Sequence, residues 1–202
     1  EVAIWKDNNN NDAFDAGDYY WNGAVWTGSE PVWNLAIGTT SWSYAIPIAV
    51  PNETLFNKYY VLTRTTDLAE NVTTTEATSQ KFYVYNNSEV WVDATYLDTK
   101  EGLGYVYFKT IQGGVDGVAA NGKVNVAAGS YTENVVINKG LQLLGADSST
   151  TFIDLSSTTS GNAISISGTS GDITIDNFTI KTADASEGAS NGISISGLTG
   201  GT

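Results

Sequence analysis

A seven-residue segment occurs twice in this chain, 29 residues apart (191 − 162 = 29). Residues 162–168 read Asn-Ala-Ile-Ser-Ile-Ser-Gly, and residues 191–197 read Asn-Gly-Ile-Ser-Ile-Ser-Gly. Isoleucine alternates with serine in both copies, which is the period of a strand with one apolar face. A repeat of this length is typical of a solenoid, in which each structural turn stacks on the previous one. Further strand-like runs lie between the copies, so the repeat favours a parallel β-helix over a sandwich.

A longer pattern precedes the repeat and predicts how the β-helix begins. Apolar residues at helical spacing predict a short amphipathic helix near 107–118, although three glycines weaken it. Together, residues 108–112, 122–137 and 141–145 resemble the opening of a pectin-lyase-like right-handed parallel β-helix. The resemblance implies a β-helix at 107–202 with this helix as its N-terminal cap. The last residues show no matching cap, so we expect the β-helix to be truncated at its C-terminal end.

Residues 1–86 carry a different pattern, in which short strands rich in Trp and Tyr are separated by turns. Val2 and Ile4 alternate at the start, and residues 59–66 form a long β-branched and aromatic run. Asn22-Gly23, between aromatic residues, predicts a hairpin turn. Short strands with turns at this spacing favour an antiparallel sandwich.

Several of these segments resemble bacterial immunoglobulin-like modules of large surface proteins. The similar segments are Tyr-Trp-Asn-Gly at 20–23, residues 38–44, Tyr-Val-Leu-Thr-Arg-Thr-Thr-Asp at 60–67 followed by Asn71, and Phe-Tyr-Val at 82–84. The sequence departs from the module pattern at Thr65 and Glu70, and we expect the first strands of such a module to be missing from it. The resemblance implies an all-β chain with an immunoglobulin-like sandwich at 1–86, joined to the β-helix by a linker or junction at 87–106.

The chain is strongly acidic and lacks three residue types. Its 202 residues contain 9 basic and 22 acidic side chains, a net charge of −13, and Arg64 is the only arginine. Nucleic acids need clustered cations, so we expect no nucleic-acid partner. Cys, His and Met are absent, which excludes disulfides, Cys/His zinc sites and thiol or imidazole catalysis.

The composition also bears on the cellular location. No run of about 18 apolar residues is present, so we expect no membrane insertion of this segment. The first residues form no basic leader or signal core, so we expect either a removed signal or an internal piece of a longer chain. Together with many Thr, Ser, Asn and Gly residues and no Cys, this indicates an extracellular or cell-surface protein of a bacterium or archaeon.

The segment 7–18 has the ligand spacing of a twelve-residue Ca²⁺ loop. Oxygen side chains fall at loop positions 1, 3, 5, 9 and 12, and position 7 would offer a main-chain carbonyl. The predicted ligands are Asp7, Asn9, Asn11, Ala13, Asp15 and Asp18. Asp12 replaces the usual turn glycine and Asp18 replaces the usual bidentate Glu. The alternative is a polar hairpin loop without a metal, because Asn and Asp are common loop residues.

A polysaccharide-active site on the β-helix is a second possibility, since the resembling fold includes pectate lyases and polygalacturonases. Hydrolysis needs two carboxylates about 5–10 Å apart, and a lyase needs Ca²⁺-binding carboxylates and a basic residue. Asp172 and Asp176 form the closest acidic pair in the repeat region, and they flank a single strand. We therefore interpret them as turn residues and expect no enzyme activity in this chain. The activity of a longer parent protein stays open.

The aromatic residues of 1–86 suggest a third kind of site, a platform on which sugar rings stack. Trp21, Trp26, Trp33 and Trp42 are the candidates, and Trp21 and Trp26 are the predicted glycan-binding residues. Trp42 alternates with Tyr44 and Ile46, which predicts a strand with Trp42 in the core. Trp21 and Trp26 flank a tight turn, so the alternative for them is a cross-strand pair.

These observations favour a structural or adhesive segment of a large extracellular surface or filament protein. The expected partners are copies of the chain itself, other surface proteins and glycans. Missing first strands would leave a sheet edge to which a neighbouring subunit donates a strand. Two alternatives stay open: a secreted polysaccharide lyase or hydrolase with its active site further along the β-helix, and a carbohydrate-binding module.

Overall fold

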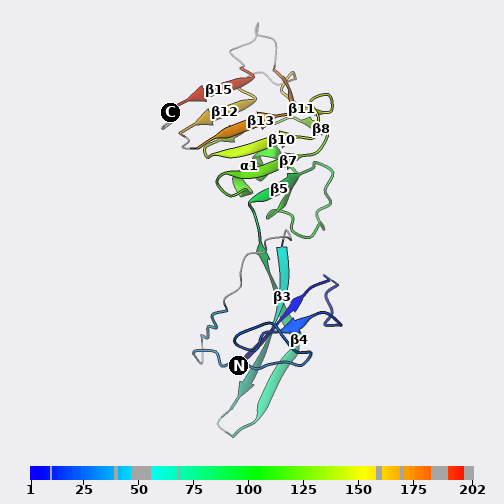
Figure 1. Cartoon of the computed structure of the whole chain (residues 1–202), viewed down its shortest axis with the longest axis vertical. Helices are drawn as coiled ribbons and strands as arrows, with labels where there is room; N and C mark the ends of the chain where they lie inside the picture. Colours follow the sequence, from blue (N-terminus) through cyan, green and yellow to red (C-terminus); the bar gives the residue numbers. More distant parts are fainter. Residues whose placement is uncertain are drawn as a thin grey trace. The chain divides into compact units, whose positions relative to one another are not determined.

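The computed structural model consists of two compact units, Glu1–Tyr85 and Asn86–Thr202 (Figure 1). It describes residues 1–9, 11–38, 41–46, 56–67, 69–157, 161–168, 171–182 and 191–197. The described elements are almost all β-strands, as expected from the sequence. No helix among them is long and apolar enough to cross a membrane.

The second unit is a coil of parallel strands. Its strands are β5 (Glu89–Val92), β6 (Tyr107–Phe108), β7 (Gly122–Val126), β8 (Gly129–Tyr131), β9 (Val135–Ile137), β10 (Leu141–Gly145), β11 (Thr151–Asp154), β12 (Ile164–Ser167), β13 (Ile173–Asp176), β14 (Thr179–Lys181) and β15 (Ile193–Ser196). Three parallel sheets have the orders β13-β10-β7-β5-β6, β14-β11-β8 and β15-β12-β9. From β7 onward each strand pairs with the third strand after it, so each turn of chain adds one strand to every sheet.

The 29-residue repeat predicts one of these pairings to the residue. Ile164 pairs with Ile193 and Ile166 with Ile195 in parallel register, so the two copies lie directly on each other. The turn before each strand repeats as well. The Asn191 side-chain amide donates to the Asn162 side-chain oxygen at 3.2 Å, and the Asn134 amide donates to the Asn162 carbonyl at 2.7 Å. Equivalent turns are therefore linked by asparagine hydrogen bonds as well as by the strand ladders.

Aliphatic side chains fill the interior of the coil. Val124 on β7 and Leu143 on β10 pair with each other, and both are 0% exposed. Ile137 on β9 pairs with Ile166 on β12 in the same way. Every second residue of these strands points inward, so stacked turns place one buried side chain above another. Burial of such side chains stabilises the fold by about 1.5–3 kcal/mol each, and it depends on the register being kept.

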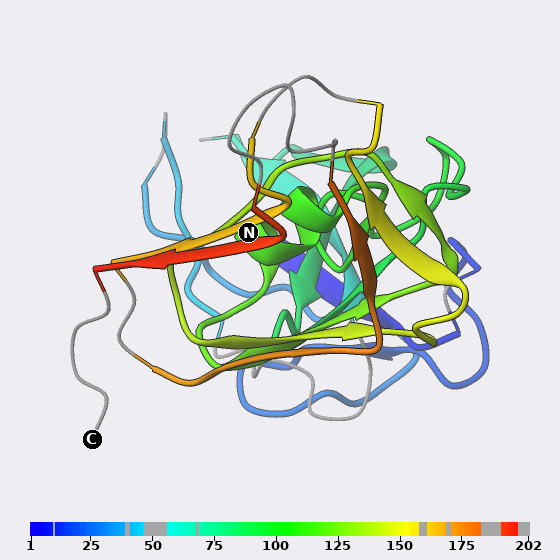
Figure 2. The same cartoon turned by 90° about the horizontal axis from the view of Figure 1, so that it is seen from above.

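Helix α1 (Ile111–Gly117) packs against β5, β6, β7 and β9 of the coil (Figure 2). It lies inside the predicted range 107–118 but is shorter, because Tyr107 and Phe108 form β6. Its first main-chain donors are satisfied by Glu133, whose carboxylate accepts from the N–H groups of Ile111 and Gln112 at 2.8 Å each. These donors have no partner within a helix. The N-cap residue Thr110 satisfies another of them, because its side chain accepts from the Gly113 N–H at 3.1 Å, so Thr110 and Glu133 together define where the helix begins.

The glycines that weaken α1 are required by its close packing. A Cβ on Gly114 would lie 2.6 Å from a methyl group of Val92 and 2.9 Å from one of Val124. A Cβ on Gly117 would lie 2.2 Å from the ring of Phe108. The low helix propensity of glycine is therefore outweighed here by the contact that its missing side chain allows.

The prediction of a linker at 87–106 needs a correction. Residues 89–92 form β5, which pairs with β7 in the five-stranded sheet, and Val90 and Val92 are buried in the core. The chain divides at Tyr85, and the second unit begins at once. The sequence around β5 resembles a junction because it is short and polar at its start. Its partner strand, β7, lies about thirty residues later in the chain, so the pairing leaves no local pattern.

The first unit contains a four-stranded antiparallel sheet of order β2-β1-β3-β4. Its strands are β1 (Val2–Asp7), β2 (Tyr19–Tyr20), β3 (Phe56–Thr66) and β4 (Val72–Tyr85). Alternate residues of β1 enter different clusters: Ala3 and Trp5 pack on one face, and Val2 and Ile4 on the other. Both faces are covered, which explains why four successive residues of β1 are buried.

The predicted hairpin near Asn22-Gly23 is present. Trp21 pairs with Trp26, the Asn22 N–H donates to the Val25 carbonyl at 3.1 Å, and Gly23 has a φ of 94°. The prediction of a strand with Trp42 in the core is wrong, since Trp42 is 49% exposed and the described residues around it form an isolated bridge, Ile37–Ser43, in place of a strand. The described residues of this unit form one sheet, so a second sheet of a sandwich is not seen among them.

The packing of α1 makes a prediction about Gly114→Ala. The added methyl group would overlap core valines, so we expect the variant to lose about 1–3 kcal/mol of unfolding free energy, more than the gain in helix propensity of about 1 kcal/mol. Chemical denaturation followed by circular dichroism measures this. Gly192→Ala is the control, because its nearest neighbour would be 3.6 Å away. Unchanged stability of Gly114→Ala would contradict the described close packing of α1 on β5 and β7.

Candidate functional site

The loop from Asp7 to Asp18 joins β1 to β2 and is held by its own carboxylates. The Asp7 side chain accepts from the N–H groups of Asn11 at 3.3 Å and Asp12 at 3.0 Å. The Asp18 side chain accepts from the N–H groups of Asn8 at 2.7 Å and Asp15 at 3.1 Å. The first and last residues of the loop, both buried, therefore each hold two main-chain N–H groups from within it.

The remaining predicted ligands lie in the same network. The side-chain amides of Asn9 and Asn11 donate to the two carboxylate oxygens of Asp15 at 2.9 and 2.6 Å. The Asn11 side-chain oxygen accepts from the N–H of Ala13 at 2.9 Å. The structure thus brings the predicted oxygen side chains together. Within the described ranges, no group of three or more Asp or Glu residues is close enough to hold a metal ion, and the Ca²⁺ site stays a prediction.

Asp12 occupies the position where such loops usually have glycine. Its φ is 64°, so it adopts the left-handed conformation that the loop pattern requires. Its carboxylate accepts hydrogen bonds from the hydroxyl of Tyr60 and, at 2.9 Å, from the ammonium of Lys58. These bonds, the one from Tyr60 first and then that from Lys58, lower the pKa of Asp12 to about 2. Burial, followed by the hydrogen bond to Asp12, raises the pKa of Tyr60.

Lys58 is a charged residue inside the first unit. It is 0% exposed, it is the Cα partner of Asp7 across β1 and β3, and its ammonium lies 3.5 Å from the Asp7 carboxylate. A buried charge is costly unless it is paired, and breaking such a pair by removing one partner costs about 3–5 kcal/mol. Lys58 therefore ties the loop to the sheet. In the sequence, Lys58 stands out as a single lysine within an aromatic strand, but the pattern does not indicate which acidic residues pair with it.

The predicted glycan-binding residues form a contact of another kind. Trp21 is only 5% exposed, and its indole N–H donates to the hydroxyl of Tyr44 at 3.2 Å. The rings of Trp21 and Trp26 pack at a centroid distance of 5.3 Å across the hairpin, and Trp26 contacts Tyr59 in turn. Trp21 and Trp26 therefore form the cross-strand pair that was the alternative to a glycan-binding platform. A glycan-binding role for these two residues stays a prediction, although the ring of Trp21 lies in the core.

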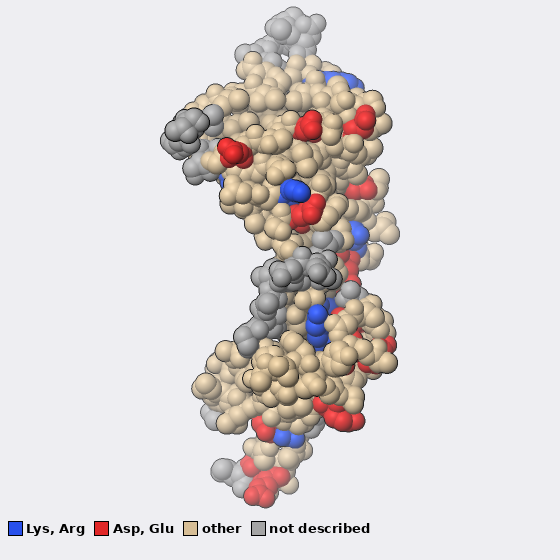
Figure 3. Space-filling model, in the orientation of Figure 1, with Lys and Arg blue, Asp and Glu red and all other residues tan. Residues whose placement is uncertain are grey.

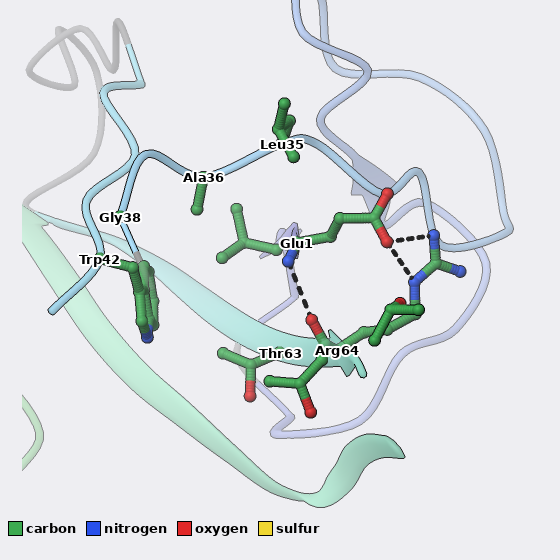
Figure 4. Close-up of a pocket in the computed structure, with 10 residues that line it drawn as sticks. Glu1, Leu35, Ala36, Gly38, Trp42, Thr63 and Arg64 are labelled. Atoms are coloured by element: carbon green, nitrogen blue, oxygen red, sulfur yellow. Dashed lines mark hydrogen bonds and ion pairs between the residues drawn. The ribbon is translucent and has the colours of Figure 1, made fainter. Parts of the chain in front are cut away.

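A cleft of about 450 Å³ lies on the first unit beside Trp42 (Figure 4). The Trp42 ring forms one wall, and the side chains of Glu1 and Arg64 form part of the opposite wall. The Arg64 guanidinium donates to the Glu1 carboxylate from Nε at 2.7 Å and lies within 2.6 Å of it at Nη2. The remaining lining residues are Val2, Leu35, Ala36, Gly38, Thr63, Thr65 and Thr66. No sequence pattern indicates this cleft, because its walls lie far apart in the chain.

Several acidic residues of the second unit hold turns and caps. Glu133 caps α1, as described above, and the Asp154 carboxylate accepts from both the hydroxyl and the N–H of Ser156. These bonds, more than the nearby Lys181, lower the pKa of Asp154 to about 2. Asp147 contacts Ser149 in the same way. Asp172 and Asp176 are both exposed. Asp172 precedes β13, in agreement with its interpretation as a turn residue, whereas Asp176 is the last residue of β13 and pairs with Leu144, so its interpretation as a turn residue is wrong.

Charge is dispersed over the visible surface. Figure 3 shows acidic side chains scattered over that face of both units, with basic side chains that do not gather into a patch. Comparison of the chain with protein-family models, curated proteins and solved structures gives no significant match. Function is therefore inferred from the residues themselves.

The contacts of Asp12 predict a pH dependence for the first unit. The pKa of its carboxyl is lower in the folded chain than the ordinary 3.8, so its stabilising contribution is present above pH 4 and is lost as the pH falls towards 2. We expect Asp12→Asn to show a smaller loss of thermal stability than the wild type over this interval. Tryptophan fluorescence measures it, since five of the six Trp residues belong to this unit.

Asp172→Asn, which removes one exposed carboxyl from the other unit, controls for the change in net charge. Identical acid profiles for the wild type and Asp12→Asn would show that the bonds from Lys58 and Tyr60 do not stabilise the folded state.

Proposed function

We propose that the chain combines an immunoglobulin-like module with the N-terminal part of a right-handed parallel β-helix. Support for the second assignment comes from three parallel sheets built by successive turns and from a capping helix at the first turn. Support for the first comes from an antiparallel sheet whose long strands β3 and β4 carry the segments that resemble such modules.

We further propose that the chain is a structural or adhesive segment of a large extracellular surface or filament protein of a bacterium or archaeon. The observation that carries this is the regular coil, in which stacked turns bury aliphatic side chains and the contacts of Glu133, Asp147 and Asp154 hold caps and turns. Stacked turns form a repetitive, cooperative scaffold whose neighbouring turns stabilise each other. An acidic surface keeps such a scaffold soluble at high local concentration.

The partners in this proposal are copies of the chain, other surface proteins and glycans. Strand β4 ends the sheet order of the first unit among the described residues, and it is fourteen residues long. A long strand at the end of a sheet offers main-chain groups to a further strand. A strand donated by a neighbouring subunit is the form of association that we propose there.

The competing function, a polysaccharide lyase or hydrolase, is tested by turnover. We expect the purified chain to release no unsaturated or reducing ends from pectin and polyuronates, with or without Ca²⁺. Immunolabelling of intact cells of the source organism should show the chain at the surface. Turnover that disappears in Asp172→Asn or Asp176→Asn would defeat the structural assignment, and labelling only after lysis would defeat the location.

We also propose Ca²⁺ as a stabilising ion of the loop 7–18. A ligand that binds only the folded state raises the unfolding midpoint with its concentration. We expect millimolar Ca²⁺ to raise the melting temperature of the wild type and not that of Asp15→Ala, because Asp15 is a predicted ligand outside the pairs made by Lys58. Mg²⁺ at the same concentration is the ionic-strength control. A wild-type melting temperature that ignores Ca²⁺ would end this proposal.

A further inference from the structure

We propose that the cleft beside Trp42 binds a neutral saccharide. The cleft is formed within the first unit by Leu35, Ala36, Gly38 and Trp42, by Glu1 and Val2, and by the end of β3 at Thr63–Thr66. Its volume of about 450 Å³ lies within the usual range of small-ligand sites, about 300–1,000 Å³. This inference rests on the proposed adhesive function and names its ligand class. The tryptophan that would stack on the sugar is Trp42, which is half-exposed, and not the buried Trp21.

Main-chain hydrogen bonds between residues on both sides of Trp42 hold the aromatic wall of the cleft in place. Ile37 and Ser43 exchange two main-chain hydrogen bonds of 2.8 Å, which fix the position of Trp42 between them. Gly38 has a φ of 107°, and a Cβ on it would lie 2.0 Å from the carbonyl oxygen of Ser41, so position 38 needs glycine. The ring of Trp42 is 49% exposed and faces the cleft (Figure 4). A half-exposed indole in a fixed position offers a flat apolar surface at low entropic cost.

The opposite wall offers polar groups in a fixed arrangement. Arg64 contacts one oxygen of the Glu1 carboxylate through Nε and Nη2, and its guanidinium lies 4.5 Å above the ring of Trp33. The two side chains remain 28% and 30% exposed. The pair thus presents hydrogen-bond donors and acceptors beside the cleft, and its two side-chain charges cancel. The α-ammonium of Glu1 is occupied as well, because it donates to the Arg64 carbonyl at 2.8 Å.

This combination selects among ligand classes. A sugar ring has an apolar face of C–H groups and an edge of hydroxyls, so the indole takes the face and the Arg64–Glu1 pair and the threonine hydroxyls take the edge. A purely apolar ligand would cover the charged pair and leave its polar groups unsatisfied. An anionic ligand would compete with Glu1 for Arg64 and approach a chain of net charge −13. A neutral saccharide avoids both costs.

The experiment is a glycan array with the whole chain, followed by calorimetric titration of the best neutral oligosaccharide. We expect Trp42→Ala to weaken binding by about tenfold or more and Arg64→Lys to weaken it as well, since lysine cannot make the same two-point contact. Ile37→Ala is the matched control: Ile37 lies on the same hairpin, is 80% exposed and does not line the cleft. Its affinity should equal that of the wild type. Denaturation midpoints of all variants establish that they are folded.

Loss of binding in Trp42→Ala with retention in Ile37→Ala supports the site. Three results would overturn it: no neutral saccharide bound at millimolar concentration, full binding by a folded Trp42→Ala, or binding of acidic sugars alone. A failure of this kind leaves the structural role standing, because that role is judged by surface labelling and by the absence of polysaccharide turnover.

Discussion

The second unit depends on one constraint, the parallel in-register stacking of successive turns. A strand on one turn finds its main-chain partners only on the turns before and after it, so no turn is stable alone. The same register places Ile137, Ile166 and Ile195 in a column and links the asparagines of equivalent turns. A slip of one residue would turn these isoleucines towards solvent and the serines between them inward. Hydrogen bonding and hydrophobic burial therefore specify the same arrangement.

The two ends of the described coil differ in how this constraint is met. At the first turns, α1 packs against the strands, and its glycines allow it to approach Val92 and Val124 closely. At the last described turn, Ile193 and Ile195 are 43% and 59% exposed, compared with nearly complete burial of Ile164 and Ile166 one turn earlier. The same Ile-Ser pattern is thus buried when a turn covers it and exposed when none of the described residues does.

In the first unit an electrostatic constraint joins the loop to the sheet. Lys58 is fully buried opposite Asp7, and its charge is balanced by Asp7 and by Asp12 from the loop. The ammonium of Lys58 on β3 therefore holds the loop to the sheet, with or without a bound divalent ion. Whether Ca²⁺ adds to this arrangement depends on the remaining oxygens of Asn9, Asn11, Asp15 and Asp18, which the loop already brings together by hydrogen bonds.

The sequence is most informative where periodicity and local turn chemistry decide the structure. The repeat predicts the pairing of Ile164 with Ile193, and Asn22-Gly23 predicts the hairpin. It is least informative where residues distant in the chain meet. The local pattern predicts a linker where β5 lies, because its partner β7 begins about thirty residues later, and alternation alone wrongly places Trp42 in the core. The cleft between Trp42 and Arg64 and the Lys58–Asp7 pair also depend on tertiary contacts that no local pattern contains.

The coil of the second unit requires this register of its stacked turns, and nuclear Overhauser contacts between main-chain protons measure the register. In a sample with isotope-labelled isoleucine, serine and valine, we expect contacts that pair 164–167 with 193–196 in the same direction, and contacts between the strands at 135–137 and 164–166. Contacts in the antiparallel direction, or displaced by one residue, would contradict it.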